Sequence, residues 1–497
     1  MGTIKTQSIK ATIISYIGVA VGFISSALIM PKVLSTDQIG LMKLIIAITG
    51  IFSSIFSFGV AQLLIRVYPT VKDNINKIAA LFWLAMRITL VGVIIALPFY
   101  YILAPQLFHI EEVVTDFTKN QGFLIAVFVM FYFRLLYISL FGYVRMMDNV
   151  VLDAFIQDVL TKGGVLVLLV LFVLNWIDFT KYVYLVMAMY LVFPFLFLWY
   201  LKQNGGIPTY HHKVKFSKPE KKEFFYLASF GLLSTIGASL YIYLDTLMVS
   251  HYLGESQVGI YGTMYLFGVI VSVPARGMKT ISASILAKAY SEGKHHEIKS
   301  IYQKSSITLL LVGGFFFVSI YSNMPSMYQY LPSAFEAGAY VVLFIGIGQL
   351  FDMLFGVNHE IIAASKYYRY NTYFVFLTAI SGIIFNIIFI PIYGITGAAL
   401  ATCLSIVSIN LLRLIAVYKL FGILPFTMKT LFGVVIITLF AVIWTWLPKL
   451  DNIVLSIAYK GTTFAFLYVT LIYILKLSDD INAIIDKILG IVFRRKS

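Results

Sequence analysis

Eight ionisable residues stand inside long apolar stretches of this 497-residue sequence. At the centre of a membrane-spanning helix, such a charge costs roughly 2.5 to 3.5 kcal/mol on insertion scales. These side chains are therefore expected to face a watery cavity or a charged partner. The set comprises Lys43, Arg87, Arg134, Asp158, Lys162, Asp245, Asp352 and Lys460.

Arg87 and Arg134 are the most central of these charges. We expect both to line a cavity, and the alternative is that they form salt bridges to Asp245 or Asp352 that hold helices together. For Lys43, Asp158, Lys162 and Lys460 a second interpretation is equally good: the side chain snorkels to the membrane interface, or the boundary of the span is shifted.

A cavity with a positive lobe suits an anion such as a pyrophosphate, because arginine forms bidentate charge-assisted bonds to phosphate oxygens. Asp245 and Asp352 are candidates for ion coupling or for a salt bridge within a lobe. The residues predicted to bind substrate in this cationic cavity are Arg87, Arg134, Lys43 and Arg66.

The composition indicates that transmembrane helices position these charges. Of all residues, 60% are hydrophobic and only 12% are charged, and the mean hydropathy is +0.91. A hydrocarbon core of about 30 Å needs roughly 20 apolar residues per helix, and on that rule the sequence predicts about 14 transmembrane helices. The net charge of +15 does not indicate nucleic-acid binding, because the basic residues punctuate apolar runs instead of gathering on one face.

The distribution of lysine and arginine predicts the topology. With the N-terminus in the cytoplasm, about 28 of these residues fall on the cytoplasmic side and about four outside, as the positive-inside rule requires. Both termini are then cytoplasmic. The first apolar run, residues 11–30, lacks a cleavage site and is expected to stay as a helix.

An internal repeat divides the predicted spans. Residues 34–41 read LSTDQIGL and residues 253–260 read LGESQVGI, at an offset of 219, and a second match follows at an offset of 222. Six spans in each half give parallel repeats, with a site between them near the midplane, an arrangement typical of transporters. The predicted parts are an N-lobe (1–201), a basic cytoplasmic linker (202–223), a C-lobe (224–420), two further spans (421–476) and an amphipathic basic cytoplasmic tail (477–497).

The sequence offers little for catalysis. No Walker loop is present. The adjacent pair Asp479 and Asp480 suits the start of the amphipathic tail helix better than a metal-dependent glycosyltransferase. A single cysteine, Cys403, excludes an intrachain disulfide, and no metal site or cofactor is expected. We therefore expect no enzyme.

Three segments resemble a known family. Residues 386–405 read NIIFIPIYGITGAALATCLS, residues 245–262 read DTLMVSHYLGESQVGIYG, and Arg66 is followed by Tyr68 and Pro69 at the end of the second span. They resemble polysaccharide-biosynthesis exporters of the multidrug/oligosaccharidyl-lipid/polysaccharide (MOP) superfamily, and in particular flippases of the O-antigen (Wzx) type. The resemblance covers nearly the whole chain and implies an all-α, MATE-like fold of two parallel six-helix lobes plus a C-terminal helix pair.

The resemblance also implies a function. A Wzx-type flippase turns an undecaprenyl-pyrophosphate-linked oligosaccharide, an O-antigen or capsule repeat unit for lipopolysaccharide or another polysaccharide, from the cytoplasmic to the periplasmic leaflet by alternating access. The expected location is the bacterial inner membrane, and the expected partners are the lipid-linked oligosaccharide, membrane lipids and polymerase or ligase proteins, without nucleic acid. Two alternatives stay open: a cation-coupled multidrug exporter of the same fold, and a non-transporting scaffold or enzyme of polysaccharide assembly. The sequence leaves open the glycan, the coupling ion and the oligomeric state.

Overall fold

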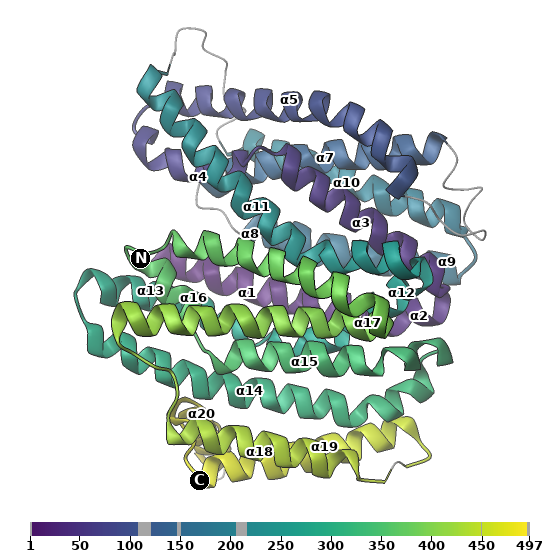
Figure 1. Ribbon diagram of the computed structural model, residues 1–497, viewed down its shortest axis with the longest axis vertical. Helices are drawn as coiled ribbons and strands as arrows, with labels where there is room; N and C mark the ends of the chain where they lie inside the picture. Colours follow the sequence, from purple (N-terminus) through teal and green to yellow (C-terminus); the bar gives the residue numbers. More distant parts are fainter. Residues whose placement is uncertain (1, 108–120, 147–150, 205–215, 449, 495–497) are drawn as a thin grey trace. The chain divides into compact units, whose positions relative to one another are not determined.

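The computed structural model describes residues 2–107, 121–146, 151–204, 216–448 and 450–494, and every regular element in these ranges is a helix. By its contacts the chain divides into two compact units, Met1–Gly259 and Ile260–Ser497. Figure 1 shows both units as bundles of long helices.

The first unit consists of long helices and shorter pieces that adjoin them. Two of the short pieces, η1 and η2, are π-helical turns, which bulge a helix locally. Its elements are α1 (Gly2–Phe23), η1 (Ile24–Ile29), α2 (Met30–Val33), α3 (Thr36–Phe56), α4 (Val60–Val71), α5 (Ile75–Leu107), α7 (Gln121–Met146), α8 (Val151–Ala154), η2 (Phe155–Leu160), α9 (Thr161–Val173), α10 (Phe179–Gln203), α11 (Lys218–Leu253) and the start of α12 (Glu255–Val269).

The second unit continues from α12 and ends with a helix at the C-terminus. Its remaining elements are η3 (Ile270–Ser272), α13 (Ala275–Ser291), α14 (His295–Tyr330), η4 (Ser333–Gly338), α15 (Ala339–Leu354), α16 (Asn358–Ala364), α17 (Tyr370–Phe421), α18 (Met428–Thr445), α19 (Ile453–Ile474) and α20 (Asp479–Arg494).

Twelve helices in the described ranges are long and apolar enough to cross a membrane, or up to 13 if the bent pair of α12 and α13 counts as one span. This confirms an all-helical, multi-pass membrane protein. The expected number of about 14 stays a prediction. The pair of α12 and α13 bends by 45°, and residues 275–291 continue as a helix where the sequence predicts a cytoplasmic loop.

α17 contains 52 residues, about 78 Å of helix at 1.5 Å per residue and more than twice the thickness of a hydrocarbon core. Gly394 interrupts it with φ 58° and ψ −137°, a conformation that favours glycine. A Cβ atom on Gly397 would lie 2.0 Å from the backbone oxygen of Phe389, so the chain folds back tightly here. The break lies inside the 386–405 segment, in which the resemblance implies a turn between two late spans.

The outward face of α5 is apolar. Leu90, Ile94 and Phe99 keep 56%, 61% and 52% of their surface exposed, whereas Ala85 and Ala96 on the inward face are buried. In water such a stripe would be costly, but in a bilayer the solvent is hydrocarbon and the stripe is the favoured surface. The apolar stripe of α5 from Leu90 to Phe99 is therefore suited to contact with lipid.

The contacts of α11 place it in the first unit, and the predicted lobe boundaries stay a prediction. α11, which the sequence assigns to the second lobe, packs on α3 and α4 and belongs to the first unit by its contacts. Lys77 of α5 also pairs with Glu220, in the first turn of α11, at 2.8 Å. Most of the predicted linker, residues 205–215, lies outside the described residues.

Candidate functional site

Arg134, in the middle of α7, is held by three neutral groups. Its guanidinium donates to the backbone oxygen of Ile46 at 2.9 Å, to Oγ1 of Thr49 at 3.1 Å and to Oη of Tyr243 at 2.8 Å. It also lies 5.7 Å from the ring centres of Tyr190 and Tyr243. Within the described ranges Arg134 makes no ion pair, so its predicted alternative role as a salt-bridge partner is not what the structure shows.

Four helices and a π-helical turn of the first unit form a cavity of about 230 Å³ around this guanidinium. Each helix contributes side chains spaced three or four residues apart, which places them on one face. We call this cavity the Arg134 pocket. Its lining residues are Ile46, Gly50 and Ser54 of α3, Arg134, Tyr137 and Ile138 of α7, Gln157 of η2, Tyr190 and Phe193 of α10, and Ser239, Ile242 and Tyr243 of α11.

Gly50 makes room for the guanidinium. A Cβ atom at this position would lie 2.5 Å from Cε2 of Tyr243 and 3.1 Å from Nη2 of Arg134. Side chains do not approach that closely, so any larger residue would push Arg134 or Tyr243 aside. The glycine thus permits the contact between α3, α7 and α11 on which the pocket depends.

A second polar chain borders the pocket. The hydroxyl of Tyr137 donates to Oδ1 of Asp153, and Nε2 of Gln157 donates to the hydroxyl of Tyr137 at 2.8 Å. Gln157 belongs to the π-helical turn η2, whose extra residue per turn re-aims side chains. The pocket therefore offers one cation, tyrosine hydroxyls and an amide, a set of donors suited to an oxygen-rich anion.

The structure does not bring the other predicted cations to this pocket. Arg87 is exposed on α5, and Arg66 is exposed on α4. Lys43 lies on α3 about one turn before Ile46 and is partly buried, but it does not line the cavity. Asp245, close to Tyr243 on α11, is also outside the lining. Of the four residues predicted to bind substrate, Arg134 alone lines the pocket.

Two of the intramembrane charges neutralise each other. Nζ of Lys162 lies 2.6 Å from Oδ1 of Asp158, one helical turn away, and Ser15 of α1 donates to Oδ2 of the same aspartate at 2.6 Å. This pairing replaces snorkelling as the account of both residues.

Asp352 is the centre of a second polar group, in the second unit. Nζ of Lys279 lies 2.6 Å from its Oδ2, and Nδ2 of Asn410 donates to its Oδ1 at 3.1 Å. Asn358 in turn donates to Oδ1 of Asn410 at 3.0 Å. Asp352 therefore forms a salt bridge within its own unit, to Lys279 and not to the arginines weighed as its partners from the sequence, and its role in ion coupling stays a prediction.

Two titratable residues of α16 lie near this salt bridge and outside the spanning helices. Burial lowers the pKa of His359 to about 4, and Arg413 and Lys279 add to the effect. Burial raises the pKa of Glu360. Its Oε2 is buried without a hydrogen-bond partner among the described residues.

Sequence reasoning missed most residues of both sites. Tyr190 and Tyr243 stand well inside their apolar runs, whereas tyrosines that anchor a span at the membrane interface stand near its ends, and this position was the available signal. Lys279 lies in α13, beyond the end of the preceding apolar run, so the search for charges inside spans did not include it. No pattern in the sequence marks Gln157, because its position depends on a π-helical turn.

Comparison with known families and structures agrees with this architecture. A family model described as "Polysaccharide biosynthesis protein" matches residues 7–280, more than half of the chain, and the model "MatE" matches residues 232–388. An uncharacterised membrane protein of Methanocaldococcus jannaschii is 23% identical over 93% of this chain and 86% of its own. A protein of Haloferax volcanii named "Probable low-salt glycan biosynthesis flippase Agl15" is 23% identical over 37% of this chain and 39% of its own.

Solved structures share the fold at low identity. An inward-facing MATE-family multidrug resistance transporter of the MOP superfamily matches 86% of this chain and 95% of its own, with a TM-score of 0.61 and 13% identity. A MOP-superfamily transporter from Pyrococcus furiosus, described as having a binding pocket of reversed polarity, matches 88% and 96%, with a TM-score of 0.55 and 14% identity. The chain therefore belongs to the polysaccharide biosynthesis protein family, as a multi-pass membrane protein with the fold of MATE-family transporters.

Proposed function

We propose that this transporter is a flippase that moves a polyprenyl-diphosphate-linked oligosaccharide from the cytoplasmic to the outer leaflet by alternating access. In a bacterial inner membrane with both termini in the cytoplasm, the carrier is undecaprenyl diphosphate and the glycan is an O-antigen or capsule repeat unit. The family supports a role in polysaccharide biosynthesis, and the Haloferax volcanii relative is named as a glycan biosynthesis flippase.

The observation that best supports the proposal is that Arg134 is held by neutral partners and lines a cavity. A cation inside a span is costly unless it has a partner, yet the three hydrogen bonds that Arg134 makes with the described residues go to neutral oxygens. A diphosphate entering the pocket would supply the missing negative charge. Phosphate oxygens carry negative charge, so a bidentate arginine–phosphate pair adds a Coulombic attraction that a hydroxyl or a carbonyl oxygen does not offer. Arg134 can thus exchange neutral partners for phosphate oxygens at a gain.

The second unit has an apolar groove of its own, and its fit to an apolar chain does not depend on the Arg134 pocket. Helices α14, α15 and α18 line a groove of about 570 Å³. Most of its wall is hydrocarbon, with Phe317, Leu343, Ile347, Ile437 and Trp446 among the lining residues. A prenyl chain is recognised by such a surface and not by polar contacts.

The direction of transport is electrically favourable. Moving two negative charges outward across a membrane potential of about 100 mV releases roughly 4.6 kcal/mol, at about 2.3 kcal/mol per charge. Export of a diphosphate toward a positive exterior therefore proceeds without ATP hydrolysis by this chain.

A cation-coupled drug exporter of the same fold is the alternative, and the match of residues 232–388 to the MatE model favours it. Such an exporter would carry an organic cation and would work better without Arg134. The charge of the pocket therefore discriminates between the two functions.

The test uses cells that lack the protein and contain a ligase acting only in the outer leaflet. Ligation of the oligosaccharide should stop and the lipid-linked intermediate should accumulate. The wild type should restore ligation, whereas Arg134→Gln should restore it at least tenfold less well.

Arg87→Gln is the matched control, because Arg87 is an arginine of a nearby span that lies on an exposed face. It should restore ligation as the wild type does. Normal ligation in cells without the protein, or full activity of Arg134→Gln at wild-type membrane abundance, would refute the proposal.

A further inference from the structure

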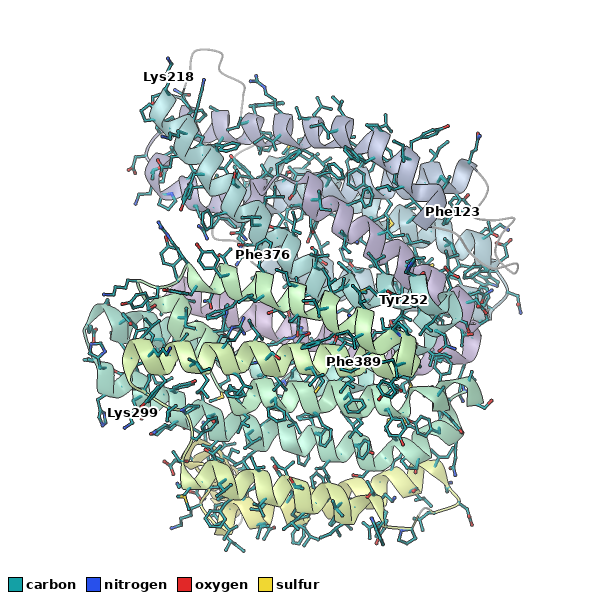
Figure 2. All side chains as sticks on the ribbon, viewed as in Figure 1. Phe123, Lys218, Tyr252, Lys299, Phe376 and Phe389 are labelled. Carbon is teal, nitrogen blue, oxygen red and sulfur yellow. The ribbon has the colours of Figure 1, made fainter. Side chains whose placement is uncertain are left out.

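A second cavity of the second unit is lined by three lysines near the ends of its helices, two of which make no ion pair with the described residues. It has a volume of about 320 Å³ and lies among the first turns of α14, the start of α18 and the start of α20. Lys299, labelled in Figure 2, lies near the beginning of α14. We call this cavity the Lys299 pocket, and its argument rests on Lys299, Lys304, Ile307, Lys429, Leu477 and Asp480.

The charges of the pocket are not balanced internally. Lys429 pairs with Asp479 at 3.2 Å, and Asp480 accepts from Thr308 at 3.4 Å. Lys299 and Lys304 make no ion pair or hydrogen bond with any side chain in the described part of the chain. The ammonium groups of Lys299 and Lys304, five residues apart on α14, thus indicate a site for an anionic ligand.

The floor of the same cavity is apolar and buried. Ile307 and Leu477 keep 6% and 3% of their surface exposed, and from Ile307 onward α14 is largely buried. A ligand here meets cations at the mouth and hydrocarbon at the floor. A small hydrated anion needs only the first of these surfaces, whereas an amphiphile uses both.

The position of the pocket along the helices places it at the membrane surface. α18 is a candidate span from its first residue, Met428, and α19 is a candidate span that ends at Ile474. The pocket lies at the beginning of α18 and just beyond the end of α19. This is the level of the lipid headgroups, on the side predicted to be cytoplasmic. α20 follows with Ile484 and Ile488 exposed by 61% and 54%, as in a helix that rests on the interface.

From this geometry we propose that the Lys299 pocket binds the phosphate headgroup of a membrane lipid in the leaflet that α20 contacts. Lys299 and Lys304 hold the phosphate oxygens, and the first carbons of the lipid chains lie against Ile307 and Leu477. Lys429 stays paired with Asp479. This site is separate from the Arg134 pocket, and its occupancy does not depend on what the transporter carries.

The test is a titration of the purified full-length protein in detergent, followed by native mass spectrometry. The probes are short-chain phosphatidylglycerol, a polyprenyl monophosphate and inorganic phosphate. Each lysine near a lipid phosphate contributes a factor of about five to binding. Lys299→Gln and Lys304→Gln should each weaken binding of phosphatidylglycerol about fivefold, and Asp480→Asn should strengthen it by a similar factor.

Lys419→Gln is the control, since Lys419 is an exposed lysine near the end of α17 and does not line the pocket. It should leave binding unchanged. Preference for phosphatidylglycerol indicates a resident phospholipid, and preference for polyprenyl monophosphate indicates a site for carrier lipids. Equal binding of inorganic phosphate, or equal binding by Lys299→Gln and the control, would overturn the proposal.

Discussion

Gly40 and Gly259 lie 219 residues apart in the chain, and each packs against the backbone oxygen of the first residue of the other's helix. A Cβ atom on Gly40 would lie 1.9 Å from the oxygen of Glu255, and one on Gly259 would lie 2.0 Å from the oxygen of Thr36. Oγ1 of Thr36 and Oγ of Ser256 are 2.7 Å apart at the same place. The two copies of the repeat motif thus contact each other reciprocally.

This contact predicts that either glycine is intolerant of a methyl group. Gly40→Ala and Gly259→Ala should each reduce the free energy of unfolding by about 1–3 kcal/mol, because the ends of α3 and α12 must separate. Thermal unfolding in detergent measures the loss. Gly163→Ala is the control: nothing lies within 4 Å of its Cβ position, so alanine should be neutral or stabilising in the helix. Equal behaviour of the three variants would contradict the prediction.

The Arg134 pocket predicts a graded series of transport defects. Tyr243→Phe removes one acceptor from Arg134 but keeps the ring, so export should fall by less than tenfold. Arg134→Lys keeps the charge but loses the planar fork, and export should fall about tenfold. Gly50→Ala should match it, because the methyl group displaces Tyr243 or Arg134. Initial rates of export at equal membrane abundance measure the series.

The series separates the contribution of the Tyr243 hydroxyl from that of the Arg134 cation and from that of the close packing at Gly50. If Tyr243→Phe were as inactive as Arg134→Gln, the hydroxyl would be as essential for export as the cation, and the predicted gradation would be wrong. If Gly50→Ala were fully active, the close packing around the guanidinium would not matter for transport.

The pair of Lys279 and Asp352 predicts a strong stability effect. Both side chains keep about a quarter of their surface exposed, 24% and 25%, so removal of one partner should cost about 3 kcal/mol, at the low end of the range for buried pairs. Lys279→Met should lower the midpoint of thermal unfolding, and the double variant with Asp352→Leu should recover most of it. Lys181→Met breaks an exposed pair and should change nothing measurable. A double variant no more stable than Lys279→Met would contradict this account.

The buried residues of α16 predict opposite pH effects. The pKa of His359 falls from its ordinary value of 6.5 to about 4, so the unfolded chain binds the proton more readily and stability is lost as the pH falls from about 6.5 to 4. The pKa of Glu360 is raised, so its contribution is present below its ordinary value of 4.5 and is lost as the pH rises through the folded pKa.

Unfolding midpoints measured as a function of pH distinguish the two groups. His359→Gln should flatten the profile between pH 4 and 6.5. Glu360→Gln should raise the midpoint at pH 8 and leave it unchanged near pH 4. Profiles of both variants parallel to that of the wild type would show that neither group is buried as described.

The sequence predicts the class of fold well, because hydropathy and the cost of an intramembrane charge are both properties of single residues in lipid. Arg134 was found for this reason. Arg87 has the same residue type and a comparable depth in its span, but it lies on an exposed face, and hydropathy does not fix the rotation of a helix. Lys279, the partner of Asp352, was not predicted because it lies in α13, a helix that follows the bend where the sequence indicates a loop.

The central claim is that Arg134 binds the diphosphate during transfer between leaflets. Purified protein in liposomes, with a fluorescent polyprenyl-diphosphate oligosaccharide and an impermeant quencher, reports transfer as the rate at which inner-leaflet fluorescence is lost. We predict that the wild type and Arg87→Gln accelerate this loss over protein-free liposomes, and that Arg134→Gln does so at least tenfold more slowly. A wild-type rate equal to that of protein-free liposomes, or an undiminished rate in Arg134→Gln, would contradict the claim.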